Sequence, residues 1–185
     1  CVFVVIRPWS HASELLALAI LLVLMYRAAR NPYGSDGFDQ IATCIFGACA
    51  VSKAFGHSAG ADVAAVAFVS AQSALAYFTA GVAKLTSPIW RSGEALVGVL
   101  STSTHGTTVL SPGCLAWASR PLSWLVIAPE VIFPLGLIGP KWLLAALLLW
   151  GTAFHFGAAA LMGLNTFFWG FLATYPCVVY IATAM

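Results

Sequence analysis

Three ionisable residues of this chain lie inside or at the end of long apolar runs, where a charge is costly. Lys84 ends one such run, Glu130 lies in another between Pro129 and Pro134, and His155 lies in a third. Ionisable groups at membrane depth are candidates for function because burying them is expensive. A desolvated lysine can act as a base, a carboxylate can carry a proton, and a histidine can shuttle protons or hydrogen-bond a quinone-like ligand.

Each of these residues also has a structural explanation. Lys84 can extend its side chain to the lipid headgroups from a helix end. Glu130 can make an interhelical hydrogen bond, and His155 can be a satisfied residue of a helix bundle. The two most internal opposite charges are Lys84 and Glu130, so we expect them on facing helices within direct or water-bridged reach.

The composition places the chain in the membrane. Of its 185 residues, 61% are hydrophobic and 8% are charged, whereas an ordinary soluble domain has about 25% charged residues. The net charge of +2 is small, and the sequence has no stretch rich in Lys and Arg. We therefore expect an integral membrane protein that binds the lipid bilayer and no nucleic acid.

Continuous apolar runs favour helices over the alternating strands of a barrel. A helix needs about 20 residues to cross a bilayer. The predicted fold is all-α, a polytopic transmembrane bundle of about six helices with one interfacial or re-entrant helix. The candidate spans are 12–29, 41–56, 61–83, 121–139, 142–164 and 166–185, all within a single membrane domain over 1–185.

The connection between the third and fourth spans predicts the interfacial helix, over 86–100. Ser87 and Pro88 can start a helix, and Trp90 and Arg91 suit a headgroup boundary. Residues 101–108 form a polar loop. If all spans cross, Arg27, Arg30, Arg91 and Arg120 fall on one side, whereas Arg7, Lys53 and Lys141 lie near the other. The bias of basic residues, four against three, favours the first side as cytoplasmic and leaves the orientation open.

The cysteines give no sign of a metal or redox centre. They stand at positions 1, 44, 49, 114 and 177, and no two of them form a Cys-x-x-Cys motif. We interpret them as small buried apolar residues and predict no metal site. A small quinone-linked thiol oxidoreductase is disfavoured for the same reason, and by the additional spans.

The stretch 77–94, which reads YFTAGVAKLTSPIWRSGE, resembles the signature of the horizontally transferred transmembrane (HTTM) domain family. That family includes the membrane domain of vitamin K-dependent γ-glutamyl carboxylase. It also has small bacterial members, among them a protein that helps to mature a sporulation-delaying peptide toxin. The similarity covers about residues 12–183, with Glu130, Phe154-His155, 162–167 and 173–176 in the expected order.

The resemblance implies a base at Lys84 that acts on an isoprenoid quinone, with His155 and Glu130 as further catalytic candidates. The residues expected to border this cofactor are Tyr77, Gly81, Trp90, Asn165 and Trp169. A histidine of the carboxylase has no counterpart in 35–40, and neither has the lumenal domain that holds the carboxylase's substrate. We therefore expect no carboxylation of glutamate by this chain alone.

Two classes of function remain open. One is a membrane enzyme, quinone-linked or engaged in peptide maturation, in the bacterial cytoplasmic membrane, with Lys84 beside a pocket for a ring-shaped apolar ligand. The other is a non-catalytic subunit packed against other membrane proteins in a larger complex. A co-purified quinone would favour the first class, and co-purified subunits without a ligand would favour the second.

Overall fold

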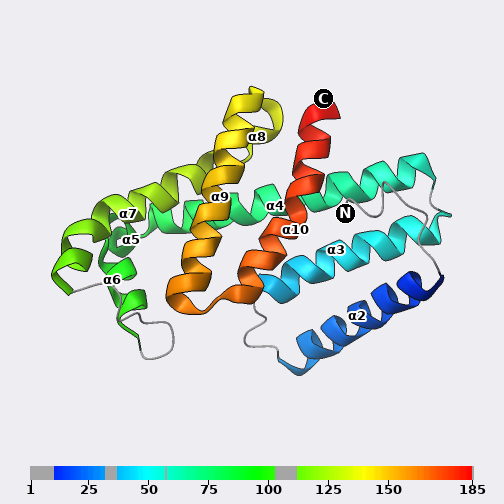
Figure 1. Ribbon diagram of the computed structural model, residues 1–185, viewed down its shortest axis with the longest axis horizontal. Helices are drawn as coiled ribbons and strands as arrows, with labels where there is room; N and C mark the ends of the chain where they lie inside the picture. The colour runs from blue at the N-terminus through cyan, green and yellow to red at the C-terminus, as the bar shows by residue number, and fades with distance from the viewer. Residues whose placement is uncertain (1–10, 32–36, 57, 103–111, 185) are drawn as a thin grey trace. The chain divides into compact units, whose positions relative to one another are not determined.

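The computed structural model describes residues 11–31, 37–56, 58–102 and 112–184, and every regular element within them is an α-helix (Figure 1). The all-helical prediction is confirmed for these residues. The helices, in chain order, are α2 (His11–Arg30), α3 (Gly37–Ala54), α4 (Ala59–Thr86), α5 (Pro88–Ser92), α6 (Glu94–Leu100), α7 (Pro112–Ile132), α8 (Leu135–Ile138), α9 (Lys141–Met162) and α10 (Asn165–Ala184).

The helix boundaries differ from the expected spans in two places. The stretch 86–100 contains two short helices, because Gly93 has φ 91° and ends α5 in the left-handed region. The expected span 121–139 starts at Pro112 and is interrupted before α8. Proline is favoured in the first turn of a helix, which explains a start at Pro112. The polar loop expected over 101–108 lies mostly outside the described residues.

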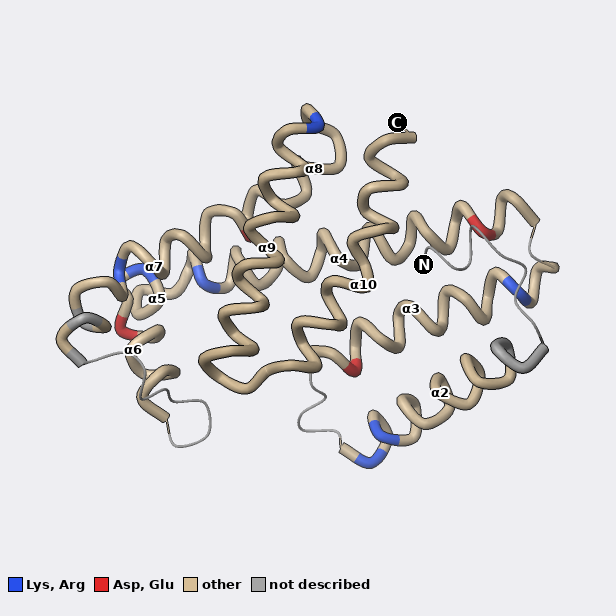
Figure 2. The backbone as a smooth tube through the Cα atoms, in the orientation of Figure 1, with Lys and Arg blue, Asp and Glu red and all other residues tan. Residues whose placement is uncertain are grey.

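Three helices, α4, α9 and α10, are long and apolar enough to cross a membrane. Large apolar side chains also cover the outside of the helices. Leu15 and Met25 on α2, and Leu149 and Phe156 on α9, are each more than half exposed. Charged positions lie mostly near helix ends (Figure 2). A surface of this kind suits contact with lipid, because soluble proteins rarely expose such large apolar areas.

The chain forms two compact units, and the first comprises residues 1–73 and 169–185. In its described part, α2 packs along α3, and Arg27 forms an ion pair of 3.1 Å with the buried Asp39. Ser73 and Thr174 share a hydrogen bond of 2.9 Å between their hydroxyls, which joins α4 to α10. Hydroxyl pairs of this kind are common between transmembrane helices. The core of this unit contains Ala48, Val66, Val69 and Cys177.

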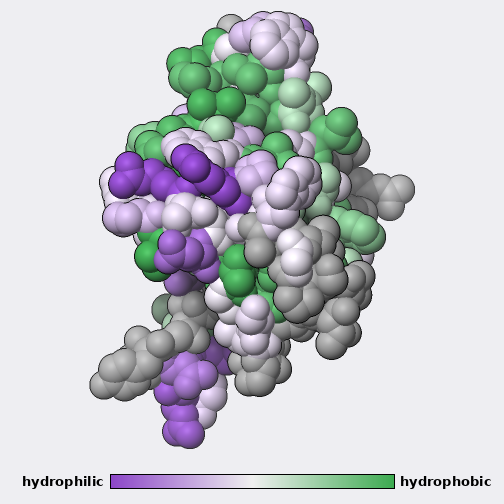
Figure 3. Space-filling view, turned by 90° about the vertical axis from the view of Figure 1, so that its left-hand side faces the viewer, coloured by the Kyte–Doolittle hydropathy of each residue, from purple (hydrophilic) through white to green (hydrophobic). Residues whose placement is uncertain are grey.

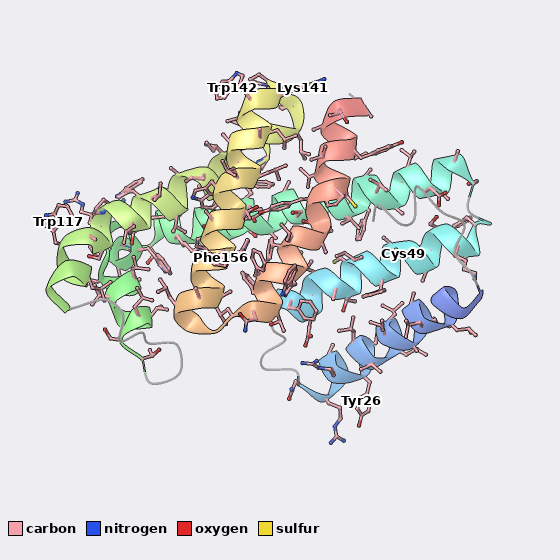
Figure 4. The ribbon with its side chains drawn as sticks, viewed as in Figure 1. Tyr26, Cys49, Trp117, Lys141, Trp142 and Phe156 are labelled. Carbon is pink, nitrogen blue, oxygen red and sulfur yellow. The ribbon has the colours of Figure 1, made fainter. Side chains whose placement is uncertain are left out.

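The second unit, residues 74–168, contains the end of α4 and the helices α5 to α9. Helices α5 and α6 pack against α7, and α8 packs against α9. Lys141 and Trp142 at the start of α9 are exposed at the tip of the turn that follows α8 (Figure 4). All three ionisable residues that the sequence singles out belong to this unit.

Helices α4 and α7 touch backbone to backbone at Gly81. A Cβ atom at position 81 would lie 2.7 Å from the Val131 nitrogen and 2.8 Å from the Glu130 Cβ. Real Cβ atoms essentially never come this close to backbone atoms, so only glycine fits without a shift of one helix. Small residues at such crossings let transmembrane helices approach closely. Gly81 therefore sets the distance at which side chains of α4 meet α7.

We predict that Gly81→Ala lowers the free energy of unfolding by about 1–3 kcal/mol, the usual cost of overpacking. The added methyl group meets backbone atoms, which cannot move aside as a flexible side chain can. Gly157→Ala in α9 is the matched control, because a Cβ there has nothing within 4 Å. Unfolding in detergent measures both variants, and equal stability of the two would contradict the close contact.

Candidate functional site

Lys84 and Glu130 form an ion pair between α4 and α7. The Lys84 Nζ lies 2.9 Å from Oε1 and 2.7 Å from Oε2 of Glu130, so both carboxylate oxygens accept hydrogen bonds from the ammonium. Hydrogen bonds between charged groups are stronger than neutral ones. The expectation that the two residues pair on facing helices is confirmed.

The two partners differ in their access to the outside. The Glu130 side chain is 3% exposed, whereas that of Lys84 is 18% exposed. The Lys84 Nζ also lies 5.4 Å from the centroid of the Trp90 ring, within the range of a cation–π contact. Lys84 is therefore the more accessible partner of the pair, and its amine lies beside Trp90.

Proline and tryptophan together shape α7 around Glu130. Pro129 has no N–H group, so it cannot donate the helical hydrogen bond to the Leu125 carbonyl. The Trp150 indole on α9 donates a hydrogen bond of 3.0 Å to that same carbonyl. A backbone carbonyl freed within an apolar environment needs such a partner. This contact attaches α9 to α7 close to the buried carboxylate.

A second polar contact lies deeper in the same unit, between Tyr77 and His155. The Tyr77 hydroxyl lies 2.7 Å from the His155 Nε2, and both side chains are 2% exposed. The Tyr77 ring also stacks on Phe133, with 4.0 Å between the ring centroids. Phe154 and Phe167 contact the imidazole from two further positions, with centroid distances of 5.0 and 5.1 Å. The histidine is thus enclosed by aromatic rings.

Helix periodicity connects the two contacts. Tyr77, Gly81 and Lys84 follow one another at spacings of four and three residues, so they share one face of α4. Glu130 lies near the end of α7 and Phe133 lies in the turn that follows it, and they meet the α4 residues in reverse order. A base, an acid and a phenol are therefore brought together where α4 meets α7, and the phenol also contacts an imidazole from α9.

The expected cofactor-binding residues lie in two different environments. Tyr77, Gly81 and Trp90 lie in the contacts described above, whereas Asn165 and Trp169 on α10 are exposed. Exposure at these two positions suits the anchor at the membrane boundary that a tryptophan commonly forms. Their proposed role at a cofactor stays a prediction.

Two residues of the site were not singled out from the sequence, Phe133 and Trp150. Phe133 lies three residues after Glu130, and Trp150 lies five residues before His155. The helical spacing from Glu130 was a usable signal for Phe133. Trp150 had a weaker signal, namely the need of the carbonyl before Pro129 for a donor.

The described residues contain no group of three or more His, Cys, Asp or Glu side chains that could hold a metal ion. Cys44 and Cys49 are free thiols but only half-buried, whereas burial was expected, and Cys177 is disulfide-bonded. Cys177 is 1% exposed in the core, which agrees with the expected burial, but its disulfide corrects the interpretation of it as a free cysteine. Sequence spacing missed it because disulfide partners need proximity in space and no local motif.

Comparisons with models of known protein families, with curated proteins and with solved structures give no match to this chain. The geometry of Lys84, Glu130, Tyr77 and His155 therefore carries the functional argument.

We predict that Lys84→Met lowers the free energy of unfolding by about 3 kcal/mol, because it leaves the Glu130 carboxyl buried without its cation. The double variant Lys84→Met/Glu130→Gln should recover at least half of that loss, since no charge then stays buried. Unfolding in detergent of these two variants and of Glu130→Gln gives the coupling free energy of the cycle. A double variant no more stable than Lys84→Met would show that the pair is not coupled.

We predict that Tyr77→Phe costs about 1–3 kcal/mol, because it leaves the buried Nε2 of His155 without the phenol while the ring can still stack on Phe133. Tyr26→Phe is the matched control, because Tyr26 on α2 is 62% exposed. Thermal unfolding should separate the two variants clearly. An equal effect at both positions would mean that the hydrogen bond contributes nothing.

Proposed function

We propose that the chain is an integral membrane protein of about six crossings in which Lys84 and Glu130 exchange protons with an apolar ligand. The ligand class is an isoprenoid quinone in its reduced form, and the location is the bacterial cytoplasmic membrane. The observation that supports this proposal is the unequal exposure of the pair, 18% for Lys84 and 3% for Glu130. The Lys84 amine is accessible to a ligand, whereas the Glu130 carboxylate, with which it exchanges a proton, is buried.

The residues fit a ligand with an apolar ring and an acidic hydroxyl. Trp90 offers an aromatic surface beside the Lys84 Nζ, and the apolar exterior of the helices admits a lipid-soluble molecule. A reduced quinone would supply the acidic hydroxyl when bound. A small hydrophilic ion would find no comparable surface next to Lys84.

The proton exchange follows from the short contact within the pair. In an apolar site an ammonium–carboxylate pair loses much of its advantage over a neutral amine–carboxylic acid pair, because charges are poorly solvated there. Transfer of one proton from the Lys84 Nζ to Glu130, across 2.7 Å, leaves a neutral amine. That amine can then accept a second proton, while Glu130 keeps the first. A general base needs this hydrogen-bond reach to its proton donor.

A second candidate function is that of a non-catalytic subunit within a larger membrane complex. The observation that favours it is the backbone contact between α4 and α7 at Gly81. The neighbouring ion pair would then serve to hold these two helices together. The exposed apolar side chains of α2 would then face neighbouring subunits. In this case Lys84 and Glu130 act in assembly alone.

We predict that the protein purified in mild detergent retains an isoprenoid quinone in near-stoichiometric amount, and that Lys84→Met lowers this amount about tenfold. Loss of one hydrogen bond to a charged group is worth about 1.5–3 kcal/mol, which corresponds to tenfold or more. Lys141→Met is the matched control, because Lys141 is exposed at the start of α9. Lipid extraction and mass spectrometry measure the retained quinone.

The variant Lys84→Met/Glu130→Gln separates loss of the base from misfolding, since it removes the stranded carboxyl as well. It should run as a single species on size exclusion and still lack quinone. A native protein without quinone, or a Lys84→Met variant that retains it fully, would reject the enzymatic proposal. Co-purified membrane subunits without a ligand would then support the structural one.

A further inference from the structure

Two arginines meet at the corner where α5 contacts α7. Gly93, which ends α5, lies directly against the α7 backbone, since a Cβ at this position would be 2.6 Å from the Arg120 nitrogen. Arg91 precedes Gly93 by two residues, so both arginines flank one backbone contact, and both are exposed. The basic positions of α5 and α7 lie side by side in Figure 2. The fold thus gathers two positive charges that are far apart in the sequence.

The charges of these two guanidinium groups are not neutralised by a carboxylate of the described residues. Among the residues that the structure describes, neither Arg91 nor Arg120 forms an ion pair with a carboxylate. The nearest acidic residue in the sequence is Glu94 in the first turn of α6, which is itself exposed. Two arginines against one glutamate leave the corner positive. A site with a guanidinium surplus suits an anion that can accept several N–H hydrogen bonds.

Two tryptophans accompany Arg120 on the outer face of α7. Trp117 is 83% exposed and Trp124 is 40% exposed, and they lie three residues before and four residues after the arginine. Side chains at these spacings share one helix face. Figure 4 shows Trp117 at the outside of α7, and Figure 3 shows hydrophilic surface beside hydrophobic surface on this side of the molecule. Exposed tryptophans are typical of the boundary between headgroups and acyl chains.

The position along the chain agrees with such a boundary. Helix α4 is one of the three candidate membrane spans and ends at Thr86, and α5 begins at Pro88. If α4 crosses the membrane, a segment that starts directly after it and ends its first helix at Gly93 lies near the membrane surface. The arginine corner is therefore placed at headgroup depth.

We propose that Arg91 and Arg120 bind the phosphate group of an anionic phospholipid, with Trp117 and Trp124 at the level where its acyl chains begin. Phosphate oxygens accept paired hydrogen bonds from guanidinium groups, which gives the contact geometry as well as charge. The tryptophans on the same face favour a lipid over a free anion, because a soluble anion would gain nothing from them. The proposal stands whether or not Lys84 exchanges protons.

The test is a titration of the purified protein with phosphatidylglycerol in neutral detergent micelles, followed by native mass spectrometry. Arg91→Gln/Arg120→Gln should weaken binding about 30-fold, roughly fivefold for each arginine. Lys141→Gln/Arg30→Gln is the control, because it removes the same charge from exposed positions on α9 and α2. Binding of phosphatidylcholine should be weak for every variant.

Four results would overturn the lipid site. Equal weakening in the control pair would reduce the effect to general charge. Unchanged affinity in Arg91→Gln/Arg120→Gln would remove these residues from the site. If inorganic phosphate displaces phosphatidylglycerol at equal concentration, the site binds anions without selectivity for a lipid. Retention of tight binding by Trp117→Ala/Trp124→Ala would contradict the proposed depth of the lipid.

Discussion

The second unit of this protein depends on the burial of one carboxyl group. Glu130 lies within an apolar helix and is 3% exposed, so it must find a cation or give up its charge. Lys84 supplies that cation from α4 and binds both carboxylate oxygens. Because the Lys84 Nζ must lie beside Glu130, the ion pair determines how α4 and α7 are aligned along their length.

The backbone makes this alignment possible. Gly81 removes the side chain that would hold α4 away from Glu130, and Pro129 leaves a carbonyl that draws the Trp150 indole from α9. Each of these features costs helix stability locally, through a missing side chain or a missing hydrogen bond. Each is offset by a contact between helices. The freed carbonyl and the close packing around Glu130 are thus one arrangement, built by residues that isolated helices would disfavour.

Sequence reasoning predicted the ion pair and missed the hydrogen bond beside it. Lys84 and Glu130 could be paired in advance because they are the most internal opposite charges, and the cost of an unpaired charge leaves few alternatives. Tyr77 and His155 are polar groups with many possible partners, so composition and spacing did not join them. Their contact depends on the rotation of α9 relative to α4, which no local pattern of residues encodes.

The helices themselves were predictable from apolar runs, but their ends were less so. Residues 112–120 contain Gly, Pro and Ser, a composition typical of loops, yet they form the first turns of α7. Packing of α5 and α6 against this segment stabilises it as a helix, which is a tertiary effect beyond local propensity. The split of 86–100 at Gly93 had a local signal in the glycine itself, whose φ of 91° favours no other residue.

The motif in 77–94 acquires a physical explanation for each of its distinctive residues. Tyr77 binds His155, Gly81 admits α7, Lys84 pairs with Glu130, and Gly93 turns the chain against α7. Every one of these roles would be needed by a purely structural scaffold. The remaining exposure of Lys84 beside Trp90 is needed both by a lysine that extends to the headgroups and by the proposed access of a ligand to the amine.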